Sequence, residues 1–244
     1  MQFSSYRSQP PSSLSASLWM YFRDVANTDL RQMLASAVRT APHNARVPIR
    51  LLSCIASTRR GLPYIKEWVK LGARSRLNYR ETLRWVPFWN SSPLLRELAR
   101  AKPHALQKIY RPYLNDRFDC SQRLSIITGH YAFMLAHGFG PLLLRAARQP
   151  VTLCEISGKS GDVYQVQLAA VGTLEREGEL VLRLCSQGEE LYSIAYTFCV
   201  DGTSASIAVG CLQGPRSADS LERIRKATRD LHGMRPKSMM VRLV

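Results

Sequence analysis

Apolar residues recur with helical spacing over the first half of the chain and with a period of two over the second half. Between residues 18 and 147, apolar positions repeat every three or four residues in short segments separated by prolines, which predicts short, irregularly packed helices. After Pro150 the alternation predicts a meander of five antiparallel strands joined by short turns. The predicted strands are residues 151–157, 162–171, 180–186, 191–200 and 206–214.

The sequence after the fifth strand predicts a helix and then one more strand. Asp219 and Glu222 resemble a capping box at the start of the helix, and Gly233 with Pro236 marks its end. The apolar residues of 237–244 favour a final strand, reached by the helical crossover and therefore parallel to its neighbour. The predicted fold class is α+β: an N-terminal irregular helical region, then a mainly antiparallel sheet with a packed helix.

Charge divides the chain at the same place as the hydrophobic pattern. Residues 1–150 hold 23 Lys and Arg against 7 Asp and Glu, whereas residues 151–244 hold 11 of each. The net charge of +16 therefore favours anionic partners for the helical half, although an Arg-rich genome composition explains it equally well. We expect a disordered leader at 1–17, a basic helical region at 18–149 and an incomplete α+β domain at 150–244.

The cysteines and one long apolar run indicate in which cellular compartment the protein is found. Six cysteines without a CxxC pair indicate free thiols in a reducing compartment, and the N-terminal residues lack the continuous apolar stretch of an export signal. Residues 124–144 form a 21-residue run without a charged side chain, which is long enough to consider as a membrane span. Because histidines, glycines and Pro141 interrupt this run, we expect two buried helices joined by a turn at 138–141.

Six separated segments carry a family signal: YRPYLNDRF at 110–118, GHY at 129–131, EREGELVLRL at 175–184, LYSIAYTF at 191–198, VGCLQGP at 209–215 and TRDLHGMRPKSMM at 228–240. In order and spacing they resemble the VirK/YbjX family of Gram-negative bacterial proteins. The resemblance implies no established chemistry, only a contribution to virulence, envelope integrity or resistance to antimicrobial peptides. It also implies a longer protein with a further helix and strands, so we expect this chain to be C-terminally truncated.

From the resemblance and the basic helical half we expect a cytoplasmic protein that contacts the inner membrane peripherally. Its expected partners are an anionic membrane surface or envelope components. The sequence assigns no catalytic residue, because neither a GxSxG elbow nor a GxxxxGK[ST] loop is present. His130 and His137 share a helix face but lack a matching carboxylate or thiol, so we expect no metal site.

The turn after the fifth strand is the first candidate ligand site. Gly214 permits close approach of a ligand, Arg216 adds charge, and the helix N-terminus favours an anion, although a purely structural turn explains these residues as well. Strand, glycine turn, helix and strand also resemble the layout of GNAT-type acyltransferases, which makes an acyl-CoA-dependent transferase the alternative function and acyl-CoA the candidate cofactor. The candidate ligand-binding residues are Gln213, Gly214, Arg216, Thr228, His232, Arg235 and Lys237.

Aromatic and arginine residues are interleaved between residues 64 and 117. Such a mixture suits base stacking with phosphate neutralisation, or contact with anionic headgroups, and it makes Arg111, Tyr113 and Arg117 candidate anion contacts. The simpler interpretation puts the aromatic rings in the core and the arginines in solvent. Nucleic-acid binding ranks third among the functions because no recognised nucleic-acid motif is present.

Overall fold

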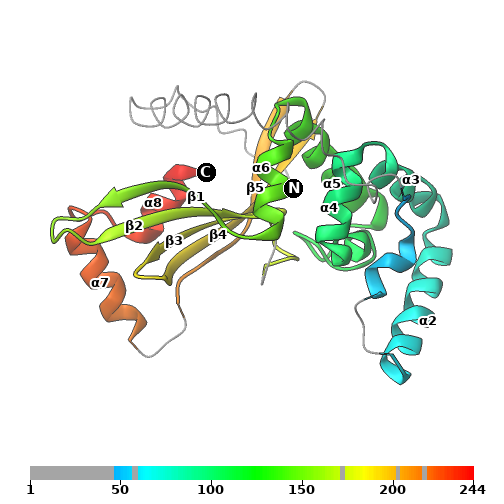
Figure 1. Ribbon diagram of the computed structural model, residues 1–244, viewed down its shortest axis with the longest axis horizontal. Helices are drawn as coiled ribbons and strands as arrows, with labels where there is room; N and C mark the ends of the chain where they lie inside the picture. The colour runs from blue at the N-terminus through cyan, green and yellow to red at the C-terminus, as the bar shows by residue number, and fades with distance from the viewer. Residues whose placement is uncertain (1–46, 57–59, 171–173, 202–203, 216–218) are drawn as a thin grey trace.

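The computed structural model describes residues 47–56, 60–170, 174–201, 204–215 and 219–244. Within these residues a group of helices comes first, and an antiparallel sheet with two further helices follows (Figure 1). The α+β fold class predicted from the change in hydrophobic period is therefore confirmed. The expected leader at 1–17 lies outside the described residues.

Prolines begin several of the N-terminal helices. A proline occupies one of the first two positions of α2, α4, η3 and α6, where its missing N–H is not needed and its fixed φ is already helical. Pro87 is an exception, because it lies inside α3. The bounds are η2 Leu51–Ile55, α2 Leu62–Leu77, α3 Tyr79–Asn90, α4 Pro93–Ala101, η3 Pro103–Tyr110, α5 Cys120–Ala136 and α6 Gly140–Arg148.

The long uncharged run contributes to two helices, as predicted. α5 begins with a capping box: the Asp119 carboxylate accepts from the Gln122 backbone N–H at 2.8 Å, and the Gln122 side chain accepts from the Asp119 N–H at 2.9 Å. Gly138 then takes a φ of 77°, which glycine tolerates, and α6 starts at Gly140. None of the helices in the described ranges is long and apolar enough to cross a bilayer.

The second half of the chain forms the predicted meander. Its five strands pair in sequence order and every pair is antiparallel. On β2, Tyr164, Val166 and Leu168 are all buried on one face, as their alternation predicts. α5 packs along β4 and α6 contacts β2, which joins the sheet to the helical part. The bounds are β1 Val151–Ser157, β2 Val163–Ala169, β3 Leu180–Ser186, β4 Glu189–Asp201 and β5 Ser204–Gln213.

The C-terminal segment corrects two predictions. α7 (Ser220–Asp230) forms, but the Asp219 side chain makes no capping hydrogen bond, so the proposed capping box is wrong. Residues 237–244 were expected to form a parallel strand, and instead they belong to helix α8 (Pro236–Leu243) and its end. Met239 and Met240 are buried on α8, which packs against β4 and β3. A short apolar run fits a buried helix as well as a strand, and here the contacts with the sheet select the helix.

One hydrophobic core extends from the helical part into the sheet and α8. Trp85 and Trp89 of α3 are completely buried and pack edge to face, with ring centroids 5.2 Å apart. Trp89 also packs against Tyr131 of α5, at a centroid distance of 5.2 Å. Because these aromatic contacts link α3 to α5 and α5 lies on β4, the polar side chains at the junction of helices and sheet are held on rigid elements.

Candidate functional site

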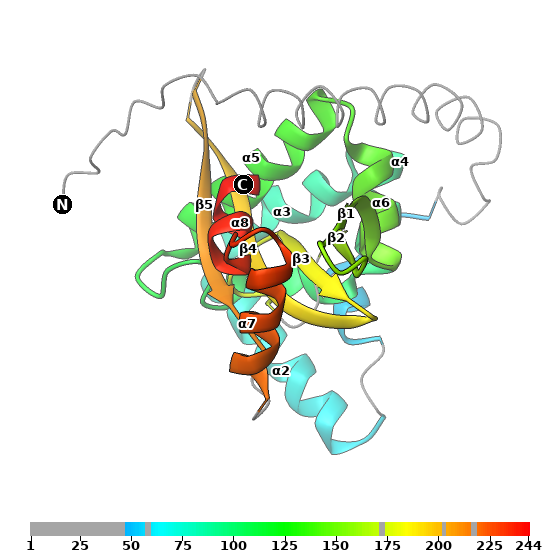
Figure 2. The same cartoon turned by 90° about the vertical axis from the view of Figure 1, so that its left-hand side faces the viewer.

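A pocket of about 920 Å³ lies where α7 and the start of α8 meet β4. Figure 2 shows α7 and α8 next to one another beside β4. Four of the eight side chains that line this α7–α8 pocket are cationic, and one is acidic. The lining residues are Tyr192, Glu222, Ile224, Arg225, Thr228, Arg229, Arg235 and Lys237.

The end of α7 explains how residues from two helices reach one pocket. Arg225 and Arg229 are four residues apart, and therefore lie on one face of α7. After the helix, His232 and Gly233 take φ values of 56° and 82°, and the Gly233 N–H donates to the Thr228 carbonyl at 2.8 Å. This reversal of the chain returns Arg235 and the N-terminus of α8 to the same pocket.

The predicted ligand residues are only partly brought together. Thr228, Arg235 and Lys237 line the pocket. Gly214 lies against its wall, because a Cβ on Gly214 would stand 3.0 Å from the Tyr192 ring and 3.5 Å from Ile224. Gln213 precedes Gly214 at the end of β5 and pairs with Ser193. His232 is exposed and is not a lining residue, and Arg216 lies outside the described residues.

Five lining residues were not predicted from the sequence: Tyr192, Glu222, Ile224, Arg225 and Arg229. The spacing of Arg225, Thr228 and Arg229 was a usable signal, since residues three and four apart share a helix face. Tyr192 is more than thirty residues away on β4 and gives no local signal. Thr228 donates its hydroxyl proton to the Ile224 carbonyl at 2.7 Å, so the pocket's strongest donors are its guanidinium and ammonium groups. Such a site is suited to an anion that carries several oxygen acceptors.

A second polar site lies at the junction of the helical part and the sheet, and we call it the Lys108–Glu179 cluster. Lys108 of η3 and Glu179 next to β3 are both buried, with Nζ 2.8 Å from Oε1. Tyr131 of α5 donates its hydroxyl proton to the other carboxylate oxygen at 2.6 Å. Burial raises the pKa of Glu179, but the charge and hydrogen bond of Lys108 oppose it and the net direction is downward. The carboxylate is therefore ionised and fully engaged.

Two more buried residues lie beside the cluster, and each has a nitrogen atom without a hydrogen-bond partner in the described part of the chain. His130 accepts from the Phe198 N–H at Nδ1, 3.2 Å away, while its Nε2 has no partner in the described part of the chain. Burial lowers the pKa of His130 to about 4, so the ring is neutral. Lys102 is buried and its Nζ also has no hydrogen-bond partner among the described residues. Burial and the nearby charge of Lys108 lower the pKa of Lys102 to about 7.

A smaller pocket of about 310 Å³ opens beside this cluster and contains two of the three predicted anion contacts. Arg111 lines it but also bonds to Gln107 and lies 3.9 Å from Glu67. Tyr113 is buried, and its hydroxyl hydrogen-bonds with Thr197 at 2.8 Å. It therefore helps to join the helical part to the sheet. Arg117 does not line the pocket. The walls of this smaller pocket are formed by His104, Lys108, Arg111, Pro112, Tyr113, Glu175, Arg176 and Glu177.

The smaller pocket is less selective for anions than the α7–α8 pocket. Glu175 and Glu177 face the same space as Lys108, Arg111 and Arg176, so charges of both signs line it. Among the residues that the structure describes, no group of three or more His, Cys, Asp or Glu gathers to hold a metal ion. All six cysteines are free thiols. The α7–α8 pocket therefore has the clearer ligand preference.

Comparisons with known proteins give one family and no fold neighbour. A family model described as "Protein of unknown function (DUF535)" matches residues 60–244. The chain is 27% identical over 173 residues to the "Uncharacterized protein YbjX" of Escherichia coli (strain K12), covering 69% of this chain and 52% of that protein. It is 26% identical over 171 residues to the "Membrane protein LapB" of Mannheimia haemolytica, covering 69% of this chain and 71% of LapB. No solved structure matches the chain.

A third similar protein, an "Uncharacterized protein" of Haemophilus influenzae, is 27% identical over 177 residues, which cover 72% of this chain and 58% of the relative. The chain thus spans about half the length of the first two curated relatives that it matches. The resemblance found in six separated segments is confirmed, because the matched residues 60–244 include all of them.

Proposed function

Because the chain belongs to the VirK/YbjX family of DUF535 proteins, we propose that it has the envelope-related role implied by the family resemblance and that it binds a phosphate-bearing small molecule in the α7–α8 pocket. That role comprises a contribution to virulence, to envelope integrity or to resistance against antimicrobial peptides, exerted from the cytoplasm. One relative, LapB of Mannheimia haemolytica, is named a membrane protein, which supports a place of action near a membrane.

The observation that carries the ligand proposal is the arrangement of cations. Arg225, Arg229, Arg235 and Lys237 line one open surface pocket, and Glu222 is the acidic side chain among its lining residues. Arginine binds phosphate oxygens in a bidentate manner and stays charged at every physiological pH. A volume of about 920 Å³ is in the range of pockets that hold a cofactor-sized ligand. Tyr192 and Ile224 provide an apolar wall for the uncharged part of such a ligand.

Coenzyme A is the most informative probe, because it carries several phosphates for the cations and a pantetheine arm that can lie against the apolar wall. The strand, the glycine and the helix that suggested an acyl-CoA site are present as β5, Gly214 and α7. The similarity to a GNAT layout stops there, since α8 replaces the parallel strand. We therefore propose binding of the phosphorylated ligand as the function, and acyl transfer as a separate outcome of the test.

Isothermal titration with CoA tests the proposal, with pantetheine as the matched compound without phosphate. We expect CoA to bind and pantetheine to bind far more weakly, and CoA affinity to fall as salt is raised. Arg229→Glu and Arg235→Glu should each weaken CoA binding about tenfold or more, because a charge-assisted hydrogen bond contributes about 1.5–3 kcal/mol. Arg242→Glu is the control, since Arg242 is an exposed α8 residue that does not line the pocket.

Absence of CoA binding, or equal loss in Arg242→Glu, would disprove the ligand proposal. Release of CoA from acetyl-CoA, with the acetyl group recovered by chromatography on an added amine acceptor, would add transferase activity to it, whereas release of CoA together with free acetate would show hydrolysis only. The envelope role is tested by expressing the chain in a bacterium that lacks its own family gene and measuring survival in a cationic antimicrobial peptide. Rescue by the wild type but not by Arg229→Glu is expected, and absence of rescue by the wild type contradicts that role for this chain.

A further inference from the structure

Helix α2 projects from the helical part at the end of the molecule remote from α7 (Figure 1). Sixteen residues form this helix, yet Leu71 is its only buried residue. Most amphipathic helices of globular proteins bury their apolar stripe against the core, whereas α2 contacts the rest of the chain through the side that carries Leu71. The remaining apolar side chains of α2 therefore require another explanation.

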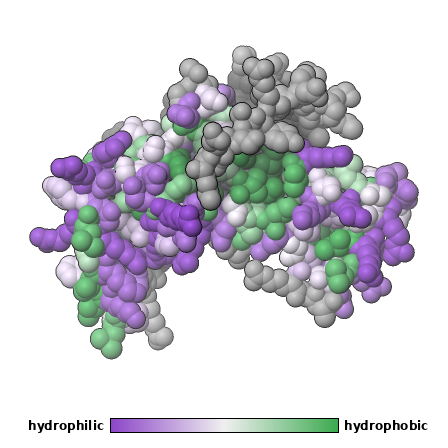
Figure 3. All heavy atoms as spheres, turned by 180° about the vertical axis from the view of Figure 1, so that it is seen from behind, coloured by the Kyte–Doolittle hydropathy of each residue, from purple (hydrophilic) through white to green (hydrophobic). Residues whose placement is uncertain are grey.

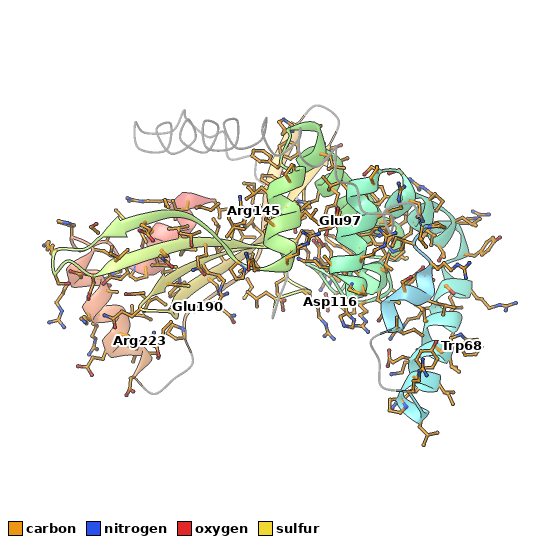
Figure 4. All side chains as sticks on the ribbon, viewed as in Figure 1. Trp68, Glu97, Asp116, Arg145, Glu190 and Arg223 are labelled. Atoms are coloured by element: carbon orange, nitrogen blue, oxygen red, sulfur yellow. The ribbon has the colours of Figure 1, made fainter. Side chains whose placement is uncertain are left out.

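These side chains form a stripe on the solvent side of α2. Leu62, Ile65 and Val69 follow the spacing of one helix face, and they are 82%, 56% and 54% exposed. Trp68 lies beside them and is 51% exposed (Figure 4). In the space-filling view, apolar atoms gather along this projecting helix (Figure 3). We call Leu62, Ile65, Trp68 and Val69 the α2 stripe.

Further exposed apolar side chains lie at the end of α2 and on α3, and the segment is positively charged. Leu77, Tyr79 and Leu83 are 85%, 62% and 56% exposed. Residues 62–90 contain six Lys or Arg and two Glu. One of the two acidic residues, Glu67, is already paired with Lys70 at 3.1 Å. The segment that carries the α2 stripe therefore combines exposed apolar side chains with a net positive charge.

This combination identifies the kind of partner. Apolar side chains that are exposed together on one helix face mark an interaction surface. Nucleic acid would engage the cations but leave the leucine and isoleucine side chains in water. The interface of an anionic bilayer receives both at once: apolar side chains enter the acyl boundary, tryptophan lies at the headgroup level, and lysine and arginine contact the anionic headgroups.

We propose that the α2 stripe and the surrounding cations dock this protein on an anionic lipid surface. α2 lies along the surface, because its exposed apolar side chains follow one side of the helix. Helices α7 and α8, whose residues line the α7–α8 pocket, lie away from α2 (Figure 1), so docking through α2 does not cover them. Docking is independent of the ligand proposed for that pocket, so that either proposal can fail without the other.

Co-sedimentation of the full chain with large unilamellar vesicles tests the proposal. Vesicles of phosphatidylcholine with 30% phosphatidylglycerol should bind the protein at least tenfold more tightly than vesicles of phosphatidylcholine alone, and 0.5 M salt should weaken the binding. Ile65→Asp and Val69→Asp should each reduce binding to the anionic vesicles about tenfold. Val241→Asp is the matched control, because Val241 is also a helical valine that is 54% exposed.

A thermal unfolding curve for each variant shows whether the fold is intact, and all three positions are exposed, so the curves should coincide with that of the wild type. Equal binding to neutral and anionic vesicles, or unchanged binding of the two α2 variants, would overturn the proposal. Light scattering after gel filtration distinguishes a second copy of the chain as the occupant. A dimer that Val69→Asp converts into a monomer, without vesicle binding by the wild type, would replace lipid docking with self-association.

Discussion

The Lys108 ammonium group and the Glu179 carboxylate form an ion pair of 2.8 Å inside the protein, 71 residues apart in the chain. Tyr131 and the Gly178 carbonyl provide further hydrogen bonds to this pair. It connects η3 and α5 with the start of β3, where the helical part meets the sheet. The pair therefore fixes a junction that hydrophobic burial alone does not orient.

The first prediction concerns removal of one partner of this pair. Lys108→Met should lower the free energy of unfolding by about 3–5 kcal/mol, because it leaves the Glu179 carboxylate buried without its cation. The double variant Lys108→Met with Glu179→Leu should cost less than Lys108→Met alone, since no unpaired charge remains. Urea unfolding monitored by circular dichroism measures both. A double variant that is less stable than Lys108→Met would contradict the predicted coupling.

The second prediction is a pH dependence caused by Lys102. Its pKa is lowered from the ordinary value of 10.5 to about 7, so the unfolded chain binds more protons than the folded chain between these values. Stability should therefore rise as the pH increases from about 7 toward 10.5, and the burial cost should be fully present below pH 7. Each pKa unit corresponds to about 1.4 kcal/mol.

Lys102→Met should flatten this rise and increase stability most at neutral pH, which urea unfolding at pH 7 and pH 9.5 measures. Lys159→Met is the control, because Lys159 is exposed. If both variants kept the same pH slope as the wild type, the charge of Lys102 would not be the cause.

The third prediction contrasts two glycines. A Cβ on Gly158 would overlap the Asp230 carboxylate, which cannot move freely because it accepts from the Ser160 N–H at 2.7 Å and from the Tyr164 hydroxyl at 2.8 Å. Gly158→Ala should destabilise the protein by about 1–3 kcal/mol. Gly72 has open space at its Cβ and lies inside α2, so Gly72→Ala should stabilise by about 0.5–1 kcal/mol. Thermal unfolding of the two variants should shift in opposite directions.

The fourth prediction compares two aspartates that precede helices. Asp119 caps α5, and Asp119→Ala should cost about 1 kcal/mol. Asp219 makes no capping bond to α7, so Asp219→Ala should change stability by less than half of that amount, about 0.5 kcal/mol or less. Chemical denaturation is sensitive enough to separate them. A cost for Asp219→Ala equal to that of Asp119→Ala would show that both residues cap their helices.

Two tryptophans between residues 64 and 117 show what a local sequence pattern leaves undecided. Trp68 and Trp85 both lie in helices with helical apolar spacing, and the sequence offered the core as the simpler place for both. The structure buries Trp85 completely and leaves Trp68 half exposed. The local patterns are alike because each reflects only neighbours within a turn or two. Burial depends on which other elements pack against the helix, and α3 receives α4 and α5 while α2 does not.

The candidate site was predictable to the extent that it is local. Gly214, Thr228, Arg235 and Lys237 come from one continuous region and were identified as one group. His232 belonged to that group but points elsewhere, because its positive φ and the following Gly233 turn the chain between the two helices. The prediction of a strand at 237–244 was wrong for a related reason. Its apolar residues determine that it is buried, but contacts with β3 and β4 decide that it is a helix.

The sequence by itself determined the change from a helical half to a sheet, the antiparallel meander, the family and the uneven distribution of charge, because these depend on residue type and on spacing over a few positions. Only the tertiary structure decided that Lys108 meets Glu179, that Tyr192 faces the cations of α7 and α8, and that α2 exposes its apolar stripe. These relationships join residues far apart in the chain. Their geometry follows from the packing of whole elements, which local hydrophobic periodicity does not specify.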